Sequence, residues 1–91
     1  MDDDRLAKYL TYVAANVRRL RAKHDMTQEA LAEAANITLR HLAEIERAKT
    51  SVSLGALVAI AEALGVTPRD LLKPAEMPEV KRGRPRKKAE G

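Results

Sequence analysis

The chain has 91 residues, of which 45% are hydrophobic, and its only aromatic residues are two tyrosines. This composition predicts one small domain with a core of Leu, Ile, Val and Ala, and the absence of cysteine excludes disulfides and thiolate metal sites. The net charge of +4 is uneven, because residues 81–91 carry six bases and one acid while the first 80 residues sum to −1, and this indicates a polyanionic partner.

The first two helices are expected over residues 5–23 and 28–35. Apolar residues recur at steps of three and four from Leu6 to Leu20, which predicts one buried face of a long helix. Thr27 is a candidate N-cap for the second helix, which is short and rich in alanine. Asn36 follows it, and asparagine tolerates the left-handed backbone that a tight turn requires.

The third helix is expected over residues 39–47, with Thr38 as its N-cap. Leu42 and Ile45 lie one turn apart on this helix and can be buried together. The residues that fall outside that buried face are Leu39, Arg40, Ala43 and Glu44.

Two further helices complete the predicted bundle. Ser53 can cap a helix over residues 54–64, whose buried stripe is expected to begin at Leu54, and Gly65 suits the residue after its end. Residues 67–70 read Thr-Pro-Arg-Asp, which is typical of a capped helix start, and they predict a short helix that ends at residue 72. The domain is therefore expected to span residues 5–73. Residues 74–91, with three prolines and no apolar period, are expected to form a flexible tail.

The second and third helices form a helix-turn-helix unit that holds the third helix out as a ridge, able to enter a major groove about 12 Å wide. Four short segments together match one known pattern: VRRLR at 17–21, MTQEALA at 26–32, IER at 45–47 and AEALGV at 61–66. Through these segments the chain resembles the lambda-repressor-like (Cro, cI and XRE) helix-turn-helix family over about two-thirds of its length. The resemblance implies an all-α, five-helix lambda-repressor-like DNA-binding bundle.

The resemblance also implies which residues would meet DNA. The expected base contacts are Thr38, Leu39, Arg40, Ala43 and Glu44. The expected phosphate contacts are Arg21, Gln28, His41, Arg47 and Lys49. Arg40 could pair with O6 and N7 of a guanine. Arg21 and Glu46 fall where members of the family often hold a salt bridge between the first and third helices.

Two residues depart from the pattern of the family. Asn36 stands where a turn glycine is usual, and this exchange is compatible with the turn. Ala48 stands where a glycine usually ends the third helix, and alanine is unfavourable at positive φ. We therefore expect either that the third helix continues or that the loop over residues 49–52 differs.

The tail carries a second motif, because residues 81–88, KRGRPRKK, resemble an AT-hook. Proline favours an extended backbone, and a glycine without a side chain can approach the floor of a narrow A·T minor groove. The predicted minor-groove residues are Arg82, Gly83, Arg84, Pro85 and Arg86. The alternative is that the tail is a nonspecific electrostatic arm.

These features predict a sequence-specific transcriptional regulator that binds double-stranded DNA as a homodimer. Two alternatives stay open: an architectural DNA-binding protein in which the tail dominates, and an antitoxin or autorepressor that acts through a toxin partner. No enzyme is expected, since phosphate-loop, dinucleotide-binding, zinc-protease and nucleophile–His–acid patterns are all missing. No cofactor or metal is expected either, because His24 and His41 lack a third ligand.

The same features predict where the protein acts. The acidic start has the wrong sign for a secretory signal, and the longest apolar run, residues 56–61, is far shorter than the ~20 residues of a membrane span. We therefore expect a soluble cytoplasmic protein of the bacterial nucleoid, without membrane contact. The expected dimer surface combines Leu71, Leu72 and the early part of the first helix.

Overall fold

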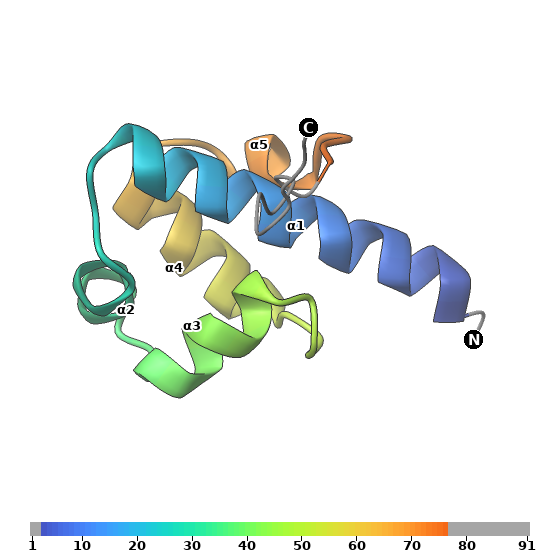
Figure 1. Ribbon diagram of the computed structural model, residues 1–91, viewed down its shortest axis with the longest axis horizontal. Coiled ribbons are helices and arrows are strands. Elements are labelled where there is room, and N and C mark those ends of the chain that lie inside the picture. The colour runs from blue at the N-terminus through green and yellow to red at the C-terminus, as the bar shows by residue number, and fades with distance from the viewer. Residues whose placement is uncertain (1–2, 77–91) are drawn as a thin grey trace, which may run out of the picture.

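The computed structural model describes residues 3–76, and all secondary structure in this part of the chain is helical. Figure 1 shows the long first helix lying across the bundle, with α4 beneath it, α2 and α3 at one side and α5 packed near its middle. The N-terminal half of α1 extends beyond the other helices. The helices in chain order are α1 (Asp3–Lys23), α2 (Gln28–Ala35), α3 (Leu39–Glu46), α4 (Leu54–Leu64) and α5 (Pro68–Leu72).

The predicted helix starts are confirmed for the last four helices. Each begins after an extended residue whose hydroxyl accepts a hydrogen bond from the backbone N–H three residues later, so one otherwise unpaired donor is satisfied. The capping residues are Thr27, Thr38, Ser53 and Thr67. The first helix differs from expectation, because it begins at Asp3 and not at Arg5. Acidic residues stabilise the positive end of a helix dipole, so Asp3 and Asp4 extend α1 by two residues without apolar burial.

The first four helices end in one shared motif. After each helix, a residue with positive φ donates its N–H to the carbonyl three residues before it, and the next N–H reaches back five residues. This pair of bonds is the Schellman motif, which satisfies carbonyls at a helix end. The residues with positive φ are Asp25, Asn36, Ala48 and Gly65. The predicted left-handed Asn36 and Gly65 are confirmed, whereas Asp25 was not anticipated.

Ala48 excludes the first of the two expected alternatives, in which α3 continues. The helix ends at Glu46, one residue before the predicted end, and Ala48 adopts a φ of 57°. The N–H of Ala48 bonds to the carbonyl of Ile45 at 3.0 Å, and that of Lys49 bonds to the carbonyl of Glu44 at 2.9 Å. The two bonds hold the alanine in a conformation that its Cβ disfavours by about 1–2 kcal/mol.

Replacing Ala48 with glycine is expected to raise the free energy of unfolding by about 0.5–1 kcal/mol. The left-handed strain disappears, although the freer unfolded chain offsets part of the gain. Ala34→Gly is the matched control, because Ala34 is exposed on α2 and the same exchange should lower stability by about 0.5–1 kcal/mol. Urea unfolding of both variants measures the difference. Destabilisation by Ala48→Gly would contradict the backbone assignment.

The core consists of aliphatic side chains from all five helices, as the composition predicts. The largest side chains that are almost completely buried are Val17, Leu31, Leu42, Ile45, Ile60 and Leu71. The expected burial of Leu54 is wrong, because 73% of this residue is exposed on the first turn of α4. The expected placement of Leu71 on a dimer surface is also wrong, since this residue is fully buried. Among the described helices, none combines the length and apolar character needed to cross a membrane.

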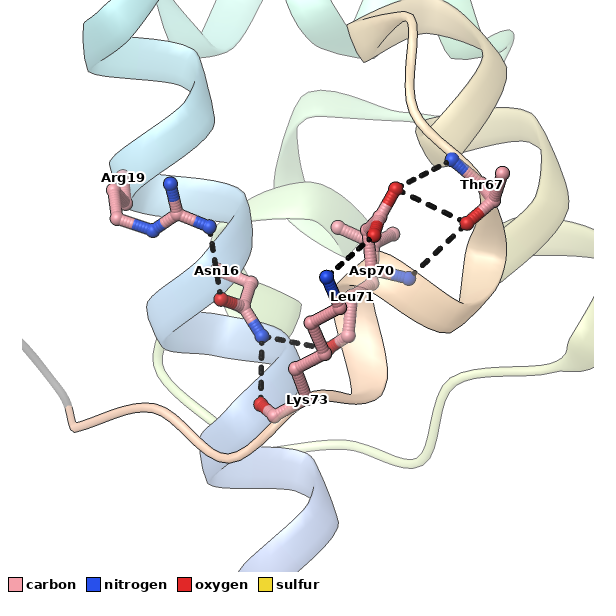
Figure 2. A network of polar contacts seen from close by, with 6 residues as sticks. All are labelled: Asn16, Arg19, Thr67, Asp70, Leu71 and Lys73. Carbon is pink, nitrogen blue, oxygen red and sulfur yellow. Dashed lines mark hydrogen bonds and ion pairs between the residues drawn. The ribbon is translucent and has the colours of Figure 1, made fainter.

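A buried amide ties α5 to α1, as Figure 2 shows. Asn16 is 2% exposed, and its Nδ2 donates to the backbone carbonyls of Leu71 and Lys73, each at 3.0 Å. Its Oδ1 accepts a hydrogen bond of 3.2 Å from Nη2 of Arg19. Because α5 has only five residues, this clamp adds long-range contacts that fix where the chain leaves the bundle.

A capping box holds the start of the same helix. Asp70 accepts hydrogen bonds of 3.0 Å from the backbone N–H and the hydroxyl of Thr67, and its other carboxylate oxygen lies 3.0 Å from Nζ of Lys73. The Lys73 ammonium, followed by the N–H and hydroxyl of Thr67, lowers the pKa of Asp70 to about 2. The box is therefore complete at neutral pH, where the carboxylate is ionised.

Candidate nucleic-acid interface

The α2–α3 pair provides the geometry that a helix-turn-helix unit needs. Asn36 takes a left-handed conformation with φ 59° and ψ 45°, so the chain turns within the three residues, 36–38, between the helices. Leu42 and Ile45 on α3 are 0% and 1% exposed, and they pack into the same core as Ala32 of α2. The buried contacts hold α3 against α1 and α2, which fixes the rotation of α3 about its axis.

The outward face of α3 carries the predicted base-contacting residues. Thr38 and Leu39 are exposed, and Ala43 is half-buried between the two faces. The Arg40 side chain is 88% exposed and that of Glu44 is 33% exposed. Nε of Arg40 lies 3.5 Å from Oε2 of Glu44, a weak pair one helical turn apart. The face thus presents a cation, an anion and an apolar group that can meet different base edges.

A buried carboxylate links α3 to α1 and α2. The Glu46 side chain is 3% exposed, and its two oxygens accept bonds of 2.8 and 3.0 Å from Nε and Nη2 of Arg21. The third donor of that guanidinium, Nη1, binds the backbone carbonyl of Met26 at 3.0 Å. The salt bridge between these positions is thus confirmed, and it is bidentate and largely removed from solvent.

Gln28 joins the same network through its side-chain amide. Its Nε2 donates a 3.0 Å hydrogen bond to Oε1 of Glu46, so one carboxylate receives donors from two other helices. The two residues are 18 positions apart in the chain, and the sequence did not predict their hydrogen bond. The sequence marks Gln28 only by its place, because it is the first residue of α2 and directly follows the N-cap Thr27.

The remaining predicted phosphate contacts lie around α3. Arg47 and Lys49 are exposed where the chain leaves the helix, and His41 is half-buried on the helix itself. The Schellman motif at Ala48 determines the path of the chain between the two basic residues. Arg21 and Gln28 are instead partly buried and engaged with Glu46, which leaves less of each side chain for a ligand.

A family model described as helix-turn-helix (HTH_3) matches residues 17–71, which is more than half of the chain. The chain belongs to the helix-turn-helix family. The match begins in the middle of α1 and ends within α5, so it contains the whole α2–α3 unit and the Arg21–Glu46 pair. The first part of α1 and all residues after Leu71 lie outside it.

Named relatives of this helix-turn-helix chain are regulators. The control protein C.BamHI of Bacillus amyloliquefaciens is 42% identical over 57 residues, which is 62% of this chain and 70% of that protein. The immunity repressor protein of Bacillus phage phi105 is 41% identical over 54 residues, 59% of this chain but only 38% of the repressor. The chain therefore spans well under half the length of that repressor.

A solved structure shows the same helix-turn-helix fold. The restriction-modification controller protein C.AhdI from Aeromonas hydrophila superposes with a TM-score of 0.66 at 31% sequence identity. The alignment covers 68% of this chain and 94% of the controller. About a third of this chain thus lies outside the part that aligns with the controller.

The predicted minor-groove residues, Arg82 to Arg86, lie outside the described residues, as does most of the predicted tail. Within residues 3–76, no three His, Cys, Asp or Glu side chains gather as a metal site would require.

Proposed function

We propose that this chain is a sequence-specific transcriptional regulator whose helix α3 enters the major groove of double-stranded DNA. The observation that carries this proposal is the division of α3 into a buried side, with Leu42 and Ile45, and an exposed side that includes Arg40. Because the buried side cannot rotate, the exposed side chains point outward in one fixed register. Relatives named as an immunity repressor and a control protein support this reading.

We further propose that the protein binds as a homodimer to two half-sites about 34 Å apart, one helical turn of DNA. A single α3 meets only a few base pairs, and a two-fold dimer doubles the sequence that is read. The protein would act on nucleoid DNA in the cytoplasm.

We assign residues 5–73 to the major-groove domain and residues 74–91 to a basic tail that binds an adjacent A·T-rich minor groove. The charge distribution supports this division, since residues 81–91 sum to +5 and the rest of the chain to −1. Arg82 and Arg84 flank Gly83, and arginines are favoured in narrow minor grooves where the negative potential is enhanced.

Selection of bound duplexes from a random pool, at one stated salt concentration, tests the proposal. We expect the full chain to enrich one motif, and a chain that ends at residue 80 to enrich the same motif with weaker affinity and a shallower salt dependence. A variant with Gly83→Ala and Pro85→Ala keeps all tail charges and serves as the matched control. If the tail is a minor-groove ligand, this variant loses its preference for A·T-rich flanks.

The second candidate is an architectural DNA-binding protein, which the basic tail on a nearly neutral body favours. In that case the pool yields no motif, and truncation at residue 80 removes most of the affinity. That result would reject sequence-specific regulation.

A further inference from the structure

Two charges on α3 oppose the dipole of their own helix. Arg40 stands in the first turn, where the dipole disfavours a cation, and Glu44 stands in the last turn, where it disfavours an anion. Elsewhere the usual order is found, because acids occur in the first turns of α2 and α5 and bases in the last turn of α1. The stability of α3 therefore does not explain why these two charges occupy it.

Of the two side chains, one is restrained and the other is exposed. The Glu44 side chain is 33% exposed, and its backbone carbonyl accepts the N–H groups of Arg47 at 3.2 Å and Lys49 at 2.9 Å. The Arg40 side chain is 88% exposed. A long side chain with so few contacts samples many rotamers, and fixing one of them on a base costs conformational entropy. Glu44 is thus placed to restrict the rotamers of Arg40.

The contact between them occupies one part of the guanidinium and leaves the rest for a ligand. Oε2 of Glu44 accepts a hydrogen bond of 3.5 Å from Nε of Arg40. The two Nη nitrogens take no part in this bond, and a pair of adjacent N–H donors is what O6 and N7 of a guanine require. An arginine held at Nε can therefore present its terminal nitrogens in one direction.

The surroundings of this ion pair change when α3 enters a major groove. In the free protein it is an exposed surface pair, and such pairs are weak in water. The groove removes water from both side chains, and the attraction between opposite charges grows as the effective dielectric constant falls. Glu44 also repels the phosphates on either side, which lowers the affinity for every duplex.

We propose that Glu44 is a positioning residue that directs the Arg40 guanidinium toward a guanine and so determines specificity. When Glu44 is removed, Arg40 reaches phosphates and other base edges, and duplexes with an exchanged base pair bind more tightly. Glu44 acts through Arg40 and not by a hydrogen bond of its own to a base. This role rests on the proposed DNA-binding function and extends it, because base discrimination then needs an acid as well as a cation.

A double-mutant cycle in base preference tests this role. The parent chain, Glu44→Ala, Arg40→Ala and the double variant are each titrated with the duplex that the random pool selects. They are also titrated with the three duplexes that carry other base pairs at the position where Arg40→Ala relaxes the preference. We expect Glu44→Ala to lower the preference at least about threefold, through tighter binding of the exchanged duplexes. In the Arg40→Ala background, the same substitution should leave the preference unchanged.

Two further variants serve as controls. Glu44→Gln keeps a side-chain oxygen that can accept a hydrogen bond from Nε, so it should retain more of the preference than Glu44→Ala. Glu62→Ala removes one exposed acid from α4 and should leave the preference unchanged. The urea midpoint of Glu44→Ala should stay close to that of the parent chain, because a weak pair is lost together with an unfavourably placed charge.

Several outcomes would overturn the positioning role. If Glu44→Ala lowers the preference equally with and without Arg40, then Glu44 contacts a base directly, for example the amino group of a cytosine. Equal tightening of all four duplexes would reduce Glu44 to a repulsive charge. Loss of stability in both Glu44→Ala and Glu44→Gln would assign the residue to the fold.

The same titrations separate this inference from the proposed function. A motif that depends on Arg40 but not on Glu44 rejects the positioning role alone. If the random pool yields no motif, the proposed function fails and the positioning role fails with it.

Discussion

Replacement of Arg21 by alanine is expected to lower the free energy of unfolding by about 3–5 kcal/mol. The exchange leaves the Glu46 carboxylate, 3% exposed, without the two N–H donors that pair with it at 2.8 and 3.0 Å. Among residues 3–76, the Gln28 amide is then the one side-chain donor left to that group. A buried carboxylate that has lost its cation is much less stable than the intact pair.

Removing both charges should restore most of the stability. In the double variant Arg21→Met and Glu46→Leu, the apolar side chains fill similar volumes and no buried charge is left. We therefore expect its free energy of unfolding to lie within about 1.5 kcal/mol of that of the parent chain. Gln28 is only partly buried and can turn its amide to water. If the double variant is much more stable than the sum of the two single substitutions predicts, Arg21 and Glu46 stabilise the fold as one unit.

Arg40→Ala is the control for this cycle, since it removes an ion pair that is exposed and 3.5 Å long. Such pairs contribute about 0.3–0.5 kcal/mol, so the urea midpoint should hardly move. A loss below about 1 kcal/mol for Arg21→Ala would contradict the buried network and reduce it to an ordinary surface pair.

The parts of this fold that were predictable are those whose causes are local. Thr27 and Thr38 cap helices through bonds that span three residues, so the pattern is visible in any short window of sequence. Gly65 is equally local, because glycine adopts positive φ without a steric penalty. The helix bounds of α2, α4 and α5 follow from such signals and agree with the structure at both ends.

The errors arise where packing overrides local preference. Ala48 has no intrinsic reason to adopt positive φ, and it does so because Leu42 and Ile45 anchor α3 while the chain must turn toward α4. Leu54 fits the apolar period of its helix, but the first turn of α4 lies at the edge of the bundle and leaves 73% of the residue exposed. A periodic pattern predicts which face points inward, not how far along the helix the core extends.

The candidate site likewise contains one contact that was predicted and one that was not. The Arg21–Glu46 pair was predicted from the family resemblance, and its presence is confirmed. The bond from Gln28 to the same carboxylate joins two helices across 18 residues, and no window of sequence contains it. The DNA contacts expected from Thr38, Leu39 and Arg40 stay predictions, because they depend on a partner as well as on the fold.

Arg40→Ala is expected to relax the base preference at one position of each half-site while the rest of the motif persists. A guanidinium that pairs with O6 and N7 of a guanine contributes about 1–3 kcal/mol of discrimination, which is roughly 5- to 150-fold in relative affinity. The side chain is 88% exposed, so its truncation leaves the core intact, and the stability control above verifies this directly.

Lys49→Ala provides the contrast for binding, because it removes an exposed charge beside the end of α3 without changing the outward face of that helix. If Lys49 contacts a phosphate, this variant binds all duplexes more weakly by a similar factor, and the slope of log affinity against log salt falls by about one. Titration of a selected duplex and of its single-base variants, at several salt concentrations, separates the two effects. Should Arg40→Ala lower affinity for every base at that position equally, Arg40 would be a phosphate contact, and base reading would fall to the other exposed residues of α3.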